Sequence, residues 1–171
     1  MDKLASKFVC STRAEDQFRF TGIDVSMSDK GIKMNQNKYL IEVIVIDKKG
    51  HPKRELTKEE FTKFRKATGK LSWLSETSRP DLAYNVLLMT YKNKNAKVED
   101  LKEMNKIIIK AKQEPSEVLF SRIVDFDEIK NLVISDGSYL KLEDKTRSVG
   151  GRFIFLSNKD EIEVRPQMWK C

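Results

Sequence analysis

Residues 57–74 read Thr-Lys-Glu-Glu-Phe-Thr-Lys-Phe-Arg-Lys-Ala-Thr-Gly-Lys-Leu-Ser-Trp-Leu, and this stretch decides the fold of the first part of the chain. Its first four residues have the spacing of a capping box, in which the Thr57 hydroxyl caps a backbone amide and the Glu60 carboxylate reaches back. Side chains then recur at steps of three and four residues, the period of one buried helix face. They are Phe61, Phe64, Thr68, Leu71 and Leu74. The stretch predicts a long amphipathic helix.

Two more helices are expected downstream. The sequence Ser78-Arg79-Pro80-Asp81 predicts a second helix start, because proline is tolerated in a first turn, where its missing amide would have no partner. A third helix is expected over residues 98–112 and stops at residues 113–116, which include a proline. Their buried faces are predicted at Leu82, Val86 and Met89 in the second helix and at Leu101, Met104 and Ile108 in the third.

Strand patterns flank these helices on both sides. Residues 17–36 alternate apolar and polar side chains around a Ser-Asp-Lys-Gly turn and predict a β-hairpin. Residues 39–47 are ambiguous, because their β-branched side chains favour a strand while a buried helix fits the same run. After residue 115 the period becomes that of strands, expected at 118–120, 131–136, 150–157 and 162–168. We therefore divide the chain into two parts, 1–114 and 115–171.

The net charge of +7 is unevenly distributed. Residues 1–114 hold 24 Lys/Arg and 16 Asp/Glu, whereas residues 115–171 hold 9 and 10. The basic residues concentrate between positions 48 and 70, where they face only three glutamates. Such a run can neutralise phosphates independently of base sequence, although a merely solvated helix face has the same composition. The candidate nucleic-acid-binding residues are Lys48, Lys49, Lys53, Arg54, Lys63, Arg65, Lys66 and Lys70.

Asp136 is the one candidate for metal chemistry. It ends an apolar strand pattern and precedes Gly137, where a carboxylate can either hold a hard cation such as Mg²⁺ or simply begin a turn. Cys10 and Cys171 lie near opposite ends of the chain, without neighbouring cysteine or histidine, and His51 lies in a turn-like Gly-His-Pro. These residues predict neither a disulfide framework nor a zinc site.

Three stretches, in order, resemble one protein family. Residues 20–25 (Phe-Thr-Gly-Ile-Asp-Val) and 31–40 resemble the F-x-G-I-E/D-V … G-I-x-I-x-Q-x-K-Y-I segment of copia-type retrotransposon reverse transcriptases. Residues 64–74 resemble their Y-R-x-x-x-G-x-L-x-Y-L, and residues 78–84 (Ser-Arg-Pro-Asp-Leu-Ala-Tyr) are similar to T-R-P-D-I-A-Y. Residues 134–139 and 147–156 resemble the Y-S-D-A-D-W … K-S-T-S-G-Y-V-F-F-L that opens the family's ribonuclease H domain.

This resemblance implies an α/β (α+β) fold with three successive pieces. They are an N-terminal hairpin like the primer grip, thumb and connection helices over residues 38–112, and the first strands of a ribonuclease H-like sheet over residues 118–170. It favours a helix around Tyr39, and it makes Gly22, Arg79, Pro80 and Asp81 structural motif residues. The Arg79 guanidinium is expected to clamp Asp81 or a carbonyl at the end of the preceding helix. Asp136 falls on the family's first Mg²⁺-binding aspartate, implied to be catalytic.

The departures from the family pattern concern catalysis. The polymerase's Tyr-x-Asp-Asp motif is expected before residue 1 and further ribonuclease H carboxylates after residue 171, while Ser138 stands where many relatives have a second aspartate. We therefore expect a piece of a Pol polyprotein that binds a primer–template duplex or RNA–DNA hybrid, with no cofactor of its own and no catalysis. The alternative is a non-enzymatic protein-interaction module derived from the same element. With no apolar signal segment, we expect an intracellular protein, cytoplasmic or nuclear.

Overall fold

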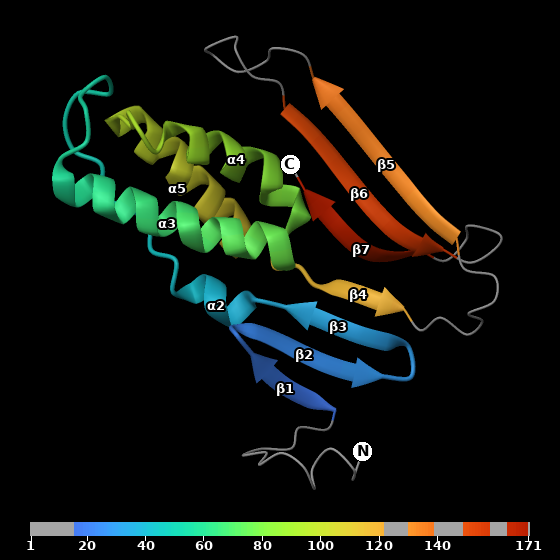
Figure 1. Ribbon diagram of the computed structural model, residues 1–171. Coiled ribbons are helices and arrows are strands. Elements are labelled where there is room, and N and C mark those ends of the chain that lie inside the picture. Colours follow the sequence, from blue (N-terminus) through green and yellow to red (C-terminus); the bar gives the residue numbers. More distant parts are fainter. Residues whose placement is uncertain (1–15, 122–129, 139–148, 158–163, 171) are drawn as a thin grey trace, which may run out of the picture.

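The computed structural model describes residues 16–121, 130–138, 149–157 and 164–170 (Figure 1). The protein is mixed α/β, with an antiparallel sheet in the N-terminal part, a layer of helices and a second antiparallel sheet. In chain order the elements are β1 Gln17–Phe20, β2 Ile23–Ser28, β3 Gly31–Asn35, α2 Asn37–Ile41, α3 Lys58–Thr77, η1 Pro80–Leu82, α4 Ala83–Lys92, α5 Val98–Gln113, β4 Val118–Ser121, β5 Lys130–Ser138, β6 Val149–Ser157 and β7 Val164–Lys170.

The first sheet begins with tight turns. A two-residue loop joins β1 to β2, and both of its residues, Thr21 (φ 48°) and Gly22 (φ 85°), have positive φ. Such turns match the twist of the flanking strands. A Cβ on Gly22 would lie 3.1 Å from Cδ2 of Tyr39, so this glycine also lets the turn approach α2 closely. The predicted hairpin is confirmed at its turn, since β2 pairs antiparallel with β3 across Ser28 and Gly31, but residues 17–25, expected to form one strand of it, are divided by the turn at Thr21 and Gly22 into β1 and β2.

The fourth strand of this sheet comes from beyond the helices. β4 pairs antiparallel with β3, with Met34 opposite Val118 and Ile32 opposite Phe120. The expectation that residues 118–120 open the second sheet is therefore wrong. Periodicity identified this strand but could not assign its partner, because strand pairing is set by tertiary contacts. The division of the chain at residues 114/115 stays a prediction.

The core lies between α3, α4 and α5. Phe64 and Leu71 of α3, Leu101 and Ile108 of α5, and Leu82 of η1 have no exposed surface. Burying such side chains contributes about 1.5–3 kcal/mol each before entropy is counted. The predicted faces of all three helices are thus confirmed, with Phe61 only partly buried at the margin of the core.

Among the described residues, the helices are too short or too polar to cross a bilayer, and the cellular compartment stays a prediction.

The ambiguous stretch 39–47 has a mixed outcome. Its start is helical, as the family resemblance implied, but α2 ends at Ile41, and residues 42–49 are neither helix nor strand. Two side chains of this irregular segment, Val43 and Ile46, are nevertheless buried. The Asn105 side chain of α5 holds the segment, because its Oδ1 accepts from the Ile46 amide at 2.9 Å and its Nδ2 donates to the Ile46 carbonyl at 2.7 Å. One amide side chain thereby forms hydrogen bonds with both backbone polar groups of a buried residue that belongs to neither a helix nor a sheet.

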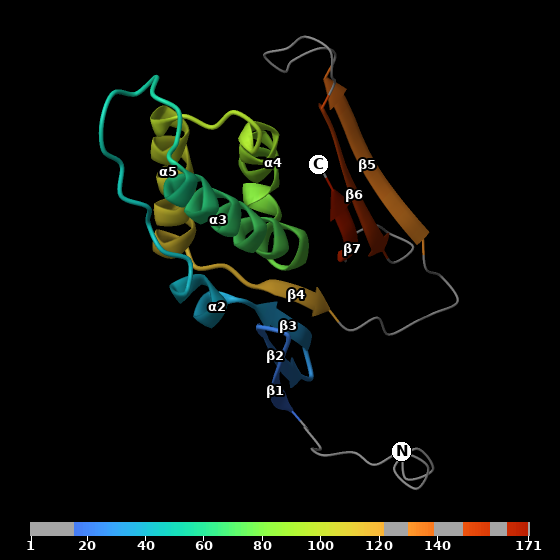
Figure 2. The same cartoon turned by 60° about the vertical axis from the view of Figure 1, so that its left-hand side comes forward.

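The second sheet has the strand order β5-β6-β7, and both pairings are antiparallel. The strand patterns predicted at 131–136, 150–157 and 162–168 are confirmed where the structure describes them. In both views the helices lie to one side of this sheet, and β7 contacts β4 of the first sheet (Figures 1 and 2).

The Asn105 contact generates a stability prediction. Asn105→Ala should lower the free energy of unfolding by about 2–3 kcal/mol, because it leaves both the amide and the carbonyl of Ile46 buried without partners. The measurement is urea denaturation of both proteins. Asn85→Ala, at an exposed position of α4, is the matched control and should change stability by less than about 0.5 kcal/mol. An equal effect of the two substitutions would contradict the role given to Asn105.

Candidate nucleic-acid interface

Helix α3 carries the candidate interface, and its start is built as predicted. The Thr57 hydroxyl accepts from the Glu60 amide at 3.3 Å, and a Glu60 carboxylate oxygen accepts from the Thr57 amide at 2.8 Å. The helix then runs for 20 residues with one face against α4 and α5. Its opposite face is left exposed.

That outer face presents a row spaced by four, three and four residues: Thr62, Lys66, Gly69 and Trp73. Trp73 is 40% exposed, and a Cβ built on Gly69 would meet nothing within 4 Å. Arg65, beside the row, is also exposed. The row therefore combines cationic side chains, a strip of bare helix backbone and an exposed indole.

Gly69 and Trp73 were missed by the sequence reasoning as site residues. Both belong to the stretch 64–74 that resembles the family, where the motif alone does not distinguish an interface residue from a structural one. A usable signal was present, because a glycine inside a helix costs about 1 kcal/mol relative to alanine and needs a reason. An aromatic residue four positions later falls on the same, outward side of the helix, away from Phe64 and Leu71.

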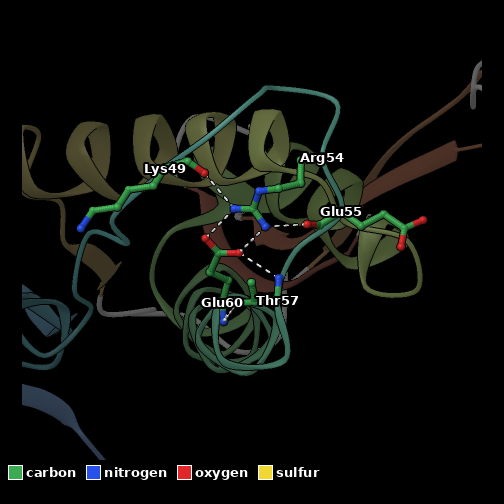
Figure 3. A network of polar contacts seen from close by, with 5 residues as sticks. All are labelled: Lys49, Arg54, Glu55, Thr57 and Glu60. Atoms are coloured by element: carbon green, nitrogen blue, oxygen red, sulfur yellow. Dashed lines mark hydrogen bonds and ion pairs between the residues drawn. The ribbon is translucent and has the colours of Figure 1, made fainter.

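Arg54, one of the eight predicted binding residues, lies in a polar network at the start of α3 (Figure 3). Its Nη1 and Nη2 donate to the two Glu60 carboxylate oxygens at 3.0 and 2.8 Å, and further to the carbonyls of Glu55 and Lys49. The hydrogen bond from Arg54, followed by that from Thr57, lowers the pKa of Glu60 to about 2. Arg54 thus closes the loop that precedes α3, and its charge is compensated by Glu60.

Two lysines of the set are also engaged within the chain. Lys63 pairs with Glu59 one turn earlier at 2.7 Å, and this hydrogen bond lowers the pKa of the Glu59 carboxyl. Lys70 lies 3.2 Å from both the carbonyl and a carboxylate oxygen of Glu42, and 5.6 Å from the centre of the Tyr39 ring. Lys70 therefore joins α3 to the segment around α2.

The other predicted cations are exposed. Lys48, Lys49 and Lys53 lie in the loop before α3, with His51 exposed beside them. Backbone bonds hold this loop against the start of α5, as in the 3.0 Å contact from the Val98 amide to the Arg54 carbonyl. A shallow, open hollow lies on the first half of α3. It is lined by Lys58, Glu59, Thr62, Lys63 and Lys66.

Arg79 makes the contact with Asp81 that the sequence suggested. Its Nε and Nη2 donate to the two Asp81 oxygens, each at 2.8 Å, and its Nη1 donates to the Ala111 carbonyl of α5 at 3.0 Å. The side chain is 3% exposed, and its hydrogen bonds lower the pKa of Asp81. The carbonyl belongs to α5 rather than to the preceding helix. Pro80 occupies the first turn of η1, as predicted, although no side chain caps that turn.

Asp136 is placed differently from the expectation. The strand does not end in a turn there, because β5 continues to Ser138, and Asp136 lies opposite Gly151 in the ladder with β6. Its side chain is exposed rather than buried beside the sheet. Within the described ranges, no group of three or more acidic, cysteine or histidine side chains could hold a metal ion. The described residues around Asp136 do not fit the Mg²⁺ that the resemblance implies, since this cation needs converging oxygen ligands.

Comparisons of the chain with protein-family models, with curated proteins and with solved structures find no match.

Cys10 and Cys171, for which the sequence predicts neither a disulfide framework nor a zinc site, lie outside the residues that the structure describes.

The Glu60 network generates a pH prediction. Because the folded-state pKa of Glu60 is about 2, below its ordinary 4.5, its contribution to stability is complete above about pH 4.5 and is lost as the pH falls towards 2. The stability difference between the protein and its Glu60→Gln variant should therefore shrink between about pH 7 and pH 3. Urea denaturation across this range measures it. Arg54→Gln should flatten the same dependence, and a difference that stays constant with pH would contradict the network.

The Arg79 geometry generates a second prediction. Arg79→Lys keeps the charge but loses the planar fork that reaches Asp81 and Ala111 together. We expect a loss of about 2 kcal/mol and a melting temperature about 5 °C lower for a chain of this size. Thermal melts are the measurement, and Arg65→Lys, at an exposed position, should leave the melting temperature unchanged. An unchanged melting temperature for Arg79→Lys with weaker duplex binding would assign Arg79 to phosphate contact.

Proposed function

We propose that this chain binds double-helical nucleic acid, independently of base sequence, through the outer face of α3. The single observation that carries the proposal is the row Lys66, Gly69 and Trp73 with Arg65 beside it. Base recognition in a duplex requires side chains shaped for a groove, whereas backbone binding requires cations and close approach. The row, with Arg65 beside it, supplies cationic side chains and, at Gly69, close access to the helix, so it fits binding to the sugar–phosphate backbone.

Gly69 is the most informative member of the row. Nothing within the described chain occupies the space that a side chain would fill, so packing does not explain the glycine. Its cost to the helix, about 1 kcal/mol, is offset if a partner approaches the backbone there. The neighbouring Trp73 offers a flat apolar surface, which can pack on a sugar or on an exposed base.

The charges divide into two groups. Arg65 and Lys66 form no ion pair with any other described residue, and they are exposed beside Gly69. They can neutralise phosphates without first breaking an internal contact, unlike Arg54, Lys63 and Lys70. The expected contribution of each phosphate neutralised is about 0.9 in the slope of log affinity against log salt.

The family resemblance supports the same reading. Residues 64–74 and 78–84 resemble the helices that hold the primer–template duplex in copia-type reverse transcriptases. The first stretch lies within α3, and the second includes η1 and the start of α4. A three-stranded antiparallel sheet after residue 130 is compatible with the opening of a ribonuclease H-like domain. We propose binding rather than catalysis for this chain, because one exposed aspartate does not supply two-metal phosphoryl chemistry.

The proposal predicts opposite effects of Gly69→Ala on stability and binding. The substitution should stabilise the free protein by about 0.5–1 kcal/mol, since the methyl group meets open space, while weakening duplex binding by crowding the backbone. Chemical denaturation measures the first effect, and fluorescence anisotropy with a labelled RNA–DNA hybrid measures the second. Stabilisation without any loss of affinity would place the nucleic acid elsewhere.

Substitution of the neighbouring side chains predicts separate salt signatures. Arg65→Ala and Lys66→Ala should each lower the salt slope by about 0.9, whereas Trp73→Ala should weaken binding at every salt concentration and leave the slope unchanged. Lys102→Ala removes an exposed lysine of α5 and is the matched control, with no expected change. If all four variants bound alike, the outer face of α3 would not be the interface.

A further inference from the structure

Four exposed aliphatic side chains lie where the irregular segment 42–49 runs along α5 (Figure 2). Val43 and Ile46 of this segment are buried in the core, so the side chains between them are turned outward on a backbone that is anchored on both sides. We call the exposed set the aliphatic patch, and its members are Ile41 (73% exposed), Ile44 (76%), Val45 (44%) and Ile109 (43%). Grouped apolar side chains with a polar margin mark a site of interaction on a protein surface.

The contacts of α5 place Ile109 beside the other members of the patch. On a helix, side chains three and four positions apart lie on the same side. Asn105, four positions earlier, holds the backbone of Ile46. Lys112, three positions later, donates from Nζ to the carbonyl of Ile41 at 3.5 Å. Ile109 therefore lies between two anchors of the segment, on the side of α5 that faces it.

The margin of the patch is cationic on balance. It holds three exposed lysines that form no ion pair with any described residue, two on the segment itself and one on α5: Lys48, Lys49 and Lys112. The carboxylates of the segment are fewer. Glu42 lies 3.2 Å from Nζ of Lys70, which compensates its charge, so Asp47 is the one carboxylate of the segment without such a partner in the described chain.

A peptide fits this surface better than a bilayer or a duplex. The backbone groups of Ile44 and Val45 bond to no other residue within the described ranges, and a lipid phase would offer such groups no partner. A duplex is bound through cations and, where bases are exposed, through aromatic stacking, whereas this surface is aliphatic and includes the Asp47 carboxylate. An extended peptide brings both backbone partners and apolar side chains.

We propose that the aliphatic patch is a docking site for an acidic peptide, an extended segment of a partner protein that carries aliphatic side chains and carboxylates. The aliphatic side chains of the peptide cover Ile44 and Ile109, while its backbone bonds to that of Ile44 and Val45. Its carboxylates face the three lysines, and this charge complementarity orients the peptide. The patch shares no residue with the row on α3, so the site is independent of the proposed duplex binding.

The first test measures peptide binding to the full chain by fluorescence anisotropy. The probes are short labelled peptides that alternate leucine with glutamate, leucine with lysine, or serine with glutamate. The leucine–glutamate peptide should bind at least about tenfold more tightly than either of the others, because one of them loses the charge match and the other loses the apolar contact. Equal binding of the two leucine peptides, or no binding of the leucine–glutamate peptide, overturns the proposal.

The second test assigns the binding to the patch. Ile44→Ser and Ile109→Ser should each weaken binding of the leucine–glutamate peptide about tenfold, since each removes a side chain that the peptide covers. Lys112→Ala should weaken it about threefold and make the affinity less dependent on salt. Ile32→Ser, at a 40% exposed aliphatic position of β3, is the matched control and should change nothing. Unchanged affinity in both Ile44→Ser and Ile109→Ser overturns the proposal.

Two further measurements separate the peptide from its rivals. Ile44→Ser should keep the melting temperature and the affinity for an RNA–DNA hybrid, because this side chain is exposed and lies off the row on α3. A loss of hybrid binding in this variant would make the patch part of the duplex interface and would overturn the proposal. Sedimentation of the chain with phosphatidylserine vesicles, abolished by Ile44→Ser, would assign the patch to a membrane and would overturn it as well.

Discussion

The buried guanidinium of Arg79 is the interaction on which the helical layer depends. A charge that is 3% exposed is costly unless its hydrogen-bonding groups find partners. Asp81 and the Ala111 carbonyl provide them, and they come from the turn after α3 and from the end of α5. These contacts join the turn after α3 to the end of α5, and the buried side chains of the two helices, among them Phe64 and Ile108, belong to one core. The orientation of α3 fixes which of its faces stays outside.

The outside of α3 shows why similar cations have dissimilar roles. Arg54 and Arg65 are both arginines of one basic run, yet Arg54 closes a loop through Glu60, whereas Arg65 is exposed without an ion pair in the described part of the chain. The distinction comes from a loop that returns towards the start of α5, held by bonds such as that from the Val98 amide to the Arg54 carbonyl. A charge count treats these residues alike. The proposed interface is accordingly smaller than the basic run and includes two uncharged residues, Gly69 and Trp73.

The second sheet raises a different question, because its exposed residues include aliphatic ones. Val133 and Ile134 remain open to solvent on the two faces of β5, while Phe153 and Phe155 of β6 stack with ring centres 5.9 Å apart. Asp136 is exposed in β5, and among the described residues no other acidic side chains gather with it to hold a cation.

The sequence by itself determined the local structure. The Thr57 and Glu60 spacing determined where α3 begins, the apolar spacing determined which faces of α3, α4 and α5 are buried, and the fork of Arg79 beside Asp81 determined a short-range contact. These features depend on neighbours within a few residues, so a linear pattern records them. Only the tertiary structure decided that β4 joins β3, that residues 42–49 are held by Asn105, and that Asp136 lies exposed in a continuing strand. Each of these depends on partners brought together from distant positions, and periodicity within a segment carries no information about which distant segment lies beside it.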